Sequence, residues 1–273
     1  MASRLPLTRT LFWLTTAHLS FVVGPVTAET GNGAPVAIPG YEVGPLIAKE
    51  SFSGDLGEWL KEGEIVALIK EGKLHVESRH PHKKNPKGNL WWRKRFQSPY
   101  LIEFDYRSLS RNGLTMVFWN ASGIDGRDLF SWQRSGNYIE YINGNIRAYH
   151  FSFHRFGSGV SNIRKAPGFH LLASAKDPVA PNDDRLHRFT IAVTGARQRI
   201  FVDGRLIHDI VDDRKTCLNQ NRWQHPLPCL GTGPVPIQGA FGIRLTQRQR
   251  ATFDNLNVYR LVKNPSADRA TDD

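Results

Sequence analysis

The stretch FTIAVTGARQRIFVDGRLIHDIVD, residues 189–212, carries the clearest fold signal in this chain. Short apolar runs over 187–194, 199–202 and 206–211 are separated by polar residues, as β-strands are. Asp203-Gly204 lies between the second and third runs, where glycine can supply the positive φ of a tight turn. The stretch therefore predicts antiparallel strands joined by a hairpin.

Similar runs extend over most of the chain. Glu71-Gly72 and Asn143-Gly144 are further turn signals between strand-like runs. We find neither a long amphipathic helical pattern nor a repeat of fixed period. So many short strands favour an all-β fold built as a two-sheet sandwich or jelly roll. Further strands are expected at 65–69, 74–78, 90–96, 101–107, 114–120, 138–142, 145–155, 168–173, 239–245 and 251–261.

Several of these runs resemble known families. The opening stretch and GAFGIRLTQRQRATFDNLNVYRL (239–261) are similar to the closing strands of concanavalin-A-like, laminin-G-like jelly rolls. GLTMVFWNASGIDGRDLF (113–130), YHFSFHR (149–155) and SNIRKAPGFHLLA (161–173) resemble the YesU-like family of bacterial jelly-roll proteins, over roughly 52–261. The resemblance implies a concanavalin-A-like sandwich and a setting in polysaccharide degradation. It suggests elimination chemistry on uronic-acid oligosaccharides.

The N-terminus has the features of a secretory leader. Arg4 and Arg9 precede an apolar run over 11–23, and Val26-Thr27-Ala28 fits a small-residue cleavage site. The run is short for a membrane anchor, the alternative interpretation, so we expect a periplasmic or secreted protein without membrane contact after cleavage. The predicted organisation is a signal peptide over 1–28, a linker over 29–44, a single jelly-roll domain over 45–263 and a flexible tail over 264–273.

The chain is basic, with 36 Lys and Arg against 25 Asp and Glu and a formal net charge of +11. A basic secreted protein suits an anionic partner. A leader followed by strands argues against nucleic acid, so we predict an acidic oligo- or polysaccharide. A charge that serves only solubility is the alternative.

The two cysteines, Cys217 and Cys229, could close a short loop as a disulfide in an oxidising compartment. A zinc site would need more ligands at closer spacing, so neither a metal site nor a cofactor is predicted. Asp254 is a candidate ligand for a structural calcium ion, although a turn-capping role is the simpler interpretation.

Residues 135–173 hold most of the candidate chemistry. Along the strand predicted over 145–155, bulky aromatics alternate with His150 and His154. We expect the histidine face to line an exposed sugar-binding surface. The opposite face should pack between the sheets, and it consists of Tyr149, Phe151 and Phe153.

The strand predicted over 138–142 should form a hairpin with this one across Asn143-Gly144. Simple register pairs Glu140 with Arg147, whereas a bulge would reverse the face on which Glu140 lies. Glu140 is therefore a candidate substrate-binding residue or half of a structural ion pair. A basic loop is expected over 161–168, with candidate carboxylate ligands at Asn162, Arg164 and Lys165.

Two earlier positions extend the candidate substrate-binding set. Arg93 lies beside Trp91 in an alternating row that suits sugar stacking and carboxylate binding, and Trp119 is a candidate sugar platform. Glu103 and Asp105 share a strand face, as the acids of jelly-roll hydrolases do. Arg107 stands where a third acid would complete that signature.

Elimination on a uronate needs a cation or amide at the carboxylate, a base for the neighbouring proton and an acid for the leaving oxygen. We assign His150 as the base and Tyr138 or Tyr141 as the acid. The predicted activity is that of a lyase or dehydratase, with a non-catalytic carbohydrate-binding module and a jelly-roll glycoside hydrolase as alternatives. The predicted carboxylate clamp is Arg93, Asn162 and Arg164.

Overall fold

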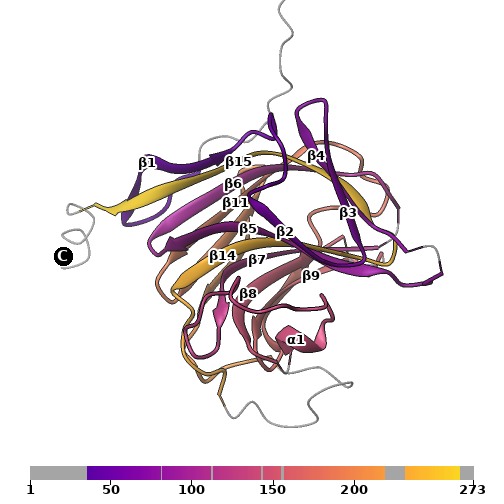
Figure 1. Cartoon of the computed structure of the whole chain (residues 1–273). Coiled ribbons are helices and arrows are strands. Elements are labelled where there is room, and N and C mark those ends of the chain that lie inside the picture. Colours follow the sequence, from indigo (N-terminus) through magenta and orange to yellow (C-terminus); the bar gives the residue numbers. More distant parts are fainter. Residues whose placement is uncertain are drawn as a thin grey trace, which may run out of the picture. The chain divides into compact units, whose positions relative to one another are not determined.

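The computed structural model describes residues 36–80, 82–111, 113–142, 144–154, 157–218 and 231–264. These residues form two antiparallel β-sheets that stack face to face (Figure 1). The all-β sandwich prediction is confirmed. No helix in the described part of the chain is long and apolar enough to cross a membrane.

One sheet has eight strands, in the order β13-β12-β11-β6-β15-β4-β3, with β1 paired to β15 beside this path. The hairpin predicted around Asp203-Gly204 is confirmed as β12 and β13, which pair antiparallel. The strands of this sheet are β1 (Tyr41–Glu50), β3 (Ile65–Lys70), β4 (Lys73–Ser78), β6 (Tyr100–Ser108), β11 (His187–Thr194), β12 (Arg197–Val202), β13 (Arg205–Val211) and β15 (Arg250–Lys263).

The other sheet has seven strands, in the order β10-β9-β8-β7-β14-β5-β2. A short helix, α1 (Ile139–Ile142), lies by β8 and β9, on the side away from the eight-stranded sheet (Figure 1). The strands are β2 (Trp59–Gly63), β5 (Lys87–Gln97), β7 (Leu114–Gly123), β8 (Ile146–Phe153), β9 (Val160–Ala166), β10 (His170–Lys176) and β14 (Gln238–Thr246).

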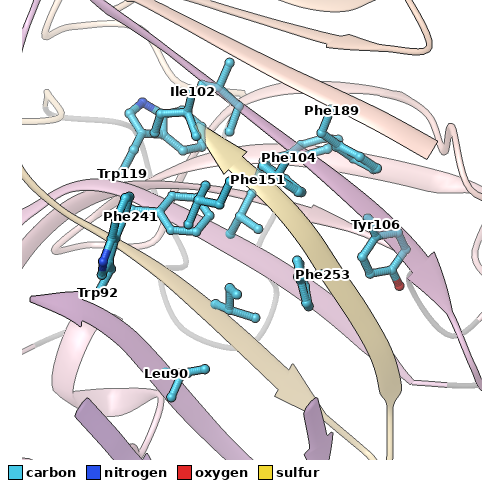
Figure 2. Close-up of a cluster of buried hydrophobic side chains, with 14 of the residues drawn as sticks. Leu90, Trp92, Ile102, Phe104, Tyr106, Trp119, Phe151, Phe189, Phe241 and Phe253 are labelled. Atoms are coloured by element: carbon cyan, nitrogen blue, oxygen red, sulfur yellow. The ribbon is translucent and has the colours of Figure 1, made fainter. Parts of the chain in front are cut away.

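The core between the sheets is rich in aromatic rings (Figure 2). Phe104 and Phe189 stack with their ring centroids 5.1 Å apart, and Phe153 lies 4.6 Å from Phe189 across the sandwich. Each fully buried ring of this kind contributes roughly 2–3 kcal/mol through its apolar area. Burial of the whole aromatic face of β8 confirms the predicted core positions, which are Tyr149, Phe151 and Phe153.

Two predicted elements are wrong. Residues 138–142 do not form a strand, because the Asn137 carbonyl accepts the backbone N–H of Glu140 and helix α1 starts there. A five-residue apolar run does not distinguish a strand from a helical turn. The basic loop predicted over 161–168 is also wrong, because most of it is strand β9, paired with β8 and β10.

The domain begins earlier than predicted. Strand β1 starts at Tyr41, inside the expected linker, and pairs with the second half of β15. Asn264, expected to open the tail, donates its backbone N–H to the Gly40 carbonyl. The proposed leader, residues 1–28, lies outside the described residues, as does the tail from residue 265.

Candidate functional site

We call the outer face the side of the seven-stranded sheet that points away from the other sheet. Strand register places a row of mostly polar residues straight across it, because Arg244 lies opposite both Asn89 and Met116. The row continues from Met116 to Ser152, then to Asn162 and Ser174. Polar side chains lie at this level on five of six neighbouring strands, which is typical of a ligand-binding face, since a core would need apolar residues there.

The neighbouring row of the outer face is more aromatic. Gly242 lies opposite Trp91 and Phe118, and Phe118 lies opposite His150. A Cβ atom on Gly242 would approach Trp91 Cε3 to 2.3 Å, so only glycine lets this indole lie across β14. Trp91 and Phe118 are in contact, with ring centroids 5.2 Å apart.

Residues 124–142, here called the cover segment, connect β7 toward β8 and lie over the aromatic row. Tyr141 on α1 is buried, and its ring centroid is 5.3 Å from that of Phe118. Arg244 fixes the segment from below, because its Nη1 donates to the Gly136 carbonyl at 2.8 Å and to Asn89 Oδ1 at 2.7 Å. The outer face is therefore a closed cluster at this level.

The expected exposure of His150 is wrong. Its side chain is fully buried, with ring centroids of Phe118, Phe169 and Tyr141 at 5.2, 5.7 and 6.4 Å. His150 does lie on the outer face, as its alternation with the aromatics predicts. The cover segment seals it there, and strand periodicity carries no information about such a cover.

His154 does not line the outer face. It follows β8 with φ of 48°, is buried, and places Nε2 3.3 Å from Ser108 Oγ of the other sheet. Burial lowers its pKa. The positive φ turns the chain and ends the strand's alternation at this point.

The two tyrosines predicted as the general acid differ in burial within the cover segment. Burial raises the pKa of Tyr141 to about 12, so its hydroxyl stays protonated as a general acid requires. Tyr138 is half-buried, with Lys87 Nζ 4.9 Å from its ring centroid. The expected pairing of Glu140 with Arg147 is wrong: Glu140 Oε1 accepts the Ser135 N–H at 2.8 Å.

The three candidates from the predicted basic loop are divided between the two faces of β9, with Asn162 and Arg164 on the outer face and Lys165 on the inner face. Asn162 accepts the Ser174 hydroxyl at 2.9 Å on the outer face, and Arg164 stacks 4.1 Å from the Phe169 ring centroid. Lys165 faces the interior, against the expectation of an exposed loop. Its Nζ lies 2.6 Å from Asp212 in an ion pair whose two side chains are each 1% exposed.

Trp119 is a core residue, so its expected role as an exposed sugar platform is wrong. It is fully buried, stacks on Tyr149 at 5.7 Å, and donates Nε1–H to Gln198 Oε1 at 2.8 Å. Gln198 belongs to the opposite sheet. The indole therefore ties the two layers together and has no surface for a ligand.

Two predicted site residues line pockets, Lys165 and Arg93, and of these Arg93 is the exposed one. A pocket of about 340 Å³ lies between β2, β5 and the cover segment, at the edge of the outer face. Arg93 is exposed at this pocket, and its guanidinium carbon lies 5.5 Å from the Phe130 ring centroid. The lining consists of Leu60, Lys61, Glu62, Arg93, Phe130, Ser131, Trp132, Gln133 and Arg134.

Charge is unevenly divided between the sheets. Among the residues of its seven strands, the sheet with the outer face carries one carboxylate, Glu62, and this acid is bound by Arg134 in a buried ion pair. The same strands carry ten Lys and Arg residues: Lys61, Lys87, Arg93, Lys94, Arg95, Arg147, Arg164, Lys165, Lys176 and Arg244.

The sequence of this chain matches a known protein family. The family described as a domain of unknown function (DUF1961) matches residues 46–258. The chain belongs to the DUF1961 family. This DUF1961 chain is 27% identical over 221 residues to the YesU protein of Bacillus subtilis strain 168, covering 77% of the chain and 92% of that relative. The YesU-like resemblance is therefore confirmed.

Solved structures place the DUF1961 domain among jelly rolls. A Bacillus subtilis protein with a galectin-like fold superposes with a TM-score of 0.71 at 25% identity, over 82% of this chain and 100% of the other. The endo-β-1,3-glucanase of Pyrococcus furiosus superposes with a TM-score of 0.54 at 14% identity, over 83% and 100%. These likenesses confirm the concanavalin-A-like fold class.

Four residues of the DUF1961 outer face and its cover segment are missing from the predicted site. Arg244 is detectable in principle, because it is the one charged residue in the otherwise uncharged strand β14. Asn89, Trp132 and Arg134 give no such signal. Their places depend on contacts with partners far along the chain, such as Arg134 with Glu62.

The predicted disulfide involves Cys217, and the candidate calcium ligand is Asp254. Cys229 lies outside the described residues, so the bridge to Cys217 stays a prediction. Asp254 lies opposite Asp105 in register, and burial raises its pKa. Within the described ranges, no three His, Cys, Asp or Glu side chains are grouped to hold a metal ion.

Proposed function

We propose that this protein binds an acidic oligo- or polysaccharide on the outer face of its seven-stranded sheet. The observation that carries the proposal is the charge of that sheet, whose strands hold ten basic residues and one acid. Two of the ten are neutralised, Lys165 by Asp212 and Arg95 by Asp128, but the strands still hold an excess of cations. Such an excess creates a positive potential that attracts polyanions. The galectin-like and glucanase relatives of the fold favour a saccharide as the polyanion.

Hydrolysis of a glycosidic bond is not the function that this face favours. A glycosidase needs two carboxyl groups about 5–10 Å apart across the scissile bond. The strands of the sheet offer Glu62 alone, and Arg134 and Asn89 occupy both of its oxygens. A glycoside hydrolase would have to draw its second acid from outside these strands.

The test is a binding panel of polygalacturonate, alginate and neutral glucan, measured by affinity electrophoresis and calorimetry. We expect affinity for the two uronate polymers and a steep loss of affinity with added salt. The double variant Lys87→Glu/Arg93→Glu reverses charge on the outer face. Arg205→Glu/Arg260→Glu makes the same net change on the other sheet, as a matched control.

Loss of uronate binding in the first double variant and its retention in the second would support the proposal. Equal losses would show a general charge effect and contradict it, as would stronger binding to the neutral glucan. Secretion through cleavage after residue 28 belongs to the same proposal, and N-terminal sequencing of the exported protein tests it.

β-Elimination is a second candidate function, and the cluster of Tyr141, His150 and Arg244 favours it. Arg244 Cζ lies 5.0 Å from the Tyr141 ring centroid, and the His150 ring centroid lies 6.4 Å from the same point. The cluster supplies a base, an acid and a cation, the three groups that elimination beside a carboxylate needs. Because His150 is buried, turnover requires the cover segment to lift from the face.

The diagnostic for elimination is a new near-ultraviolet absorbance from the unsaturated product. His150→Gln and Tyr141→Phe should each abolish that absorbance while polymer binding persists. Binding to several uronate polymers with no absorbance change in the wild type would leave a non-catalytic binding module as the function.

A further inference from the structure

We infer that the pocket between β2, β5 and the cover segment is the subsite that binds the carboxylate of one sugar unit, with Arg93 as the specificity-determining residue. This inference rests on the proposed function and assigns its substrate class to particular side chains. The pocket, at about 340 Å³, falls within the range of ligand pockets, roughly 300–1,000 Å³.

A bulge in β5 exposes the first cation. The pairing of β5 with β14 shifts register between Ala240 and Gly242, and three consecutive exposed cations begin at Arg93. Of these, Arg95 is neutralised by Asp128 at 2.6 Å. Within the described part of the chain, Arg93 has no carboxylate at ion-pair distance, and its guanidinium borders the pocket beside Phe130.

A second guanidinium forms part of the pocket wall. Arg134 is buried, with its side chain 2% exposed, and its two terminal nitrogens bind Glu62 and the Leu129 carbonyl. Among the described residues, nothing accepts a hydrogen bond from its Nε–H. This nitrogen has almost no accessible surface, so Arg134 forms the wall and holds Glu62 in place, while the exposed Arg93 is the guanidinium that a ligand can reach.

Aromatic surface accompanies these donors. Trp132 is half-buried in the pocket lining, with the Arg134 guanidinium carbon 4.6 Å from its ring centroid, and Gln133 beside it is exposed. A sugar ring has apolar C–H patches that can pack on such a ring. Its carboxylate can accept parallel N–H bonds from a planar guanidinium, which is the strongest geometry for this pair.

The experiment compares trigalacturonate with its neutral methyl ester by calorimetry on the full chain. Arg93→Gln should weaken binding of the acid on the order of tenfold to a hundredfold, as for loss of a charge-assisted hydrogen bond, and should change binding of the ester by less than about twofold. Lys94→Gln removes the same charge one residue away, and we expect a loss below about threefold. Trp132→Ala should weaken both ligands, and Trp132→Phe should restore most of the loss.

Three results would overturn the inference. If the wild type prefers the acid but Arg93→Gln and Lys94→Gln weaken it equally, the pocket does not select the carboxylate although the proposed function stands. If a sulfated neutral trisaccharide binds with the same dependence on Arg93 as the acid, the subsite recognises sulfate as well, and the carboxylate assignment fails. A wild type that binds no uronate ligand would remove the proposed function and this inference together.

Discussion

The two sheets share one core but differ in the balance of basic and acidic residues on their strands. Strands of the eight-stranded sheet carry eleven basic and seven acidic residues, and their charges pair across neighbouring strands. Arg188 lies opposite Asp105 in register and binds it at 2.6 Å, and Arg197 binds Asp209 at 2.7 Å. The seven-stranded sheet has no such balance, because its strands hold a single acid.

The difference distinguishes a scaffold surface from the proposed ligand surface. Cross-strand ion pairs cancel their own field, and the exposed ones among them contribute little beyond local stability. An excess of cations over acids leaves a net positive field that can attract an external anion. The comparison predicts that substitutions of charge in the seven-stranded sheet have large and specific effects, whereas those in the eight-stranded sheet have small ones.

The largest expected effect comes from Lys165→Met. Removal of the ammonium leaves Asp212 buried beside Tyr149 and without its ion-pair partner, which should cost about 3–5 kcal/mol of unfolding free energy. Urea denaturation followed by tryptophan fluorescence measures the change. A loss below about 1 kcal/mol would mean that water reaches this pair, contrary to its burial.

Acid should destabilise the protein through a histidine that bridges the two sheets. His208 of β13 is buried against Phe151 and bonds Ser161 at 3.0 Å, and burial lowers its pKa to about 4. Because the unfolded chain takes up this proton near pH 6.5, stability is complete above that value and falls as the pH drops toward 4, by on the order of 2–3 kcal/mol.

The measurement for His208 is the melting temperature between pH 7 and pH 4, in wild type and His208→Gln. The variant should lose less stability over this interval. His154, whose pKa is also lowered by burial, contributes to the acid sensitivity that remains. Parallel curves for the two proteins would contradict the assignment.

An intermediate effect is expected from Gly242→Ala on the outer face. The added methyl meets the Trp91 indole, and overpacking of this kind costs about 1–3 kcal/mol. Gly54→Ala is the control, because a methyl group added there would have no other atom within 4 Å. Equal stabilities for both variants would show that the Trp91 indole can move away from β14 without cost, contrary to the prediction.

The smallest effect is expected from Arg197→Met in the eight-stranded sheet. Its ion pair with Asp209 is partly exposed, so the loss should stay below about 1 kcal/mol and saccharide affinity should not change. Denaturation and calorimetry on the same sample measure both. A loss as large as that of Lys165→Met would erase the proposed distinction between the sheets.

Sequence periodicity predicted the scaffold well and the site poorly, for physical reasons that particular residues illustrate. The alternation of Tyr149, Phe151 and Phe153 is local, so their burial follows from the two-residue repeat of a strand. The burial of His150 depends on a segment that folds back over the sheet. The partner of Lys165 is Asp212, forty-seven residues away, and no local pattern marks such a pair.

The cover segment joins β7 and β8, which are adjacent antiparallel strands of one sheet. A connection between neighbouring strands can lengthen or shorten without disturbing the register of any other pair. Family members can therefore differ in how much of the outer face the cover segment buries while keeping the same sandwich. The space left open beside the cover segment becomes a property that evolution can adjust at a single connection.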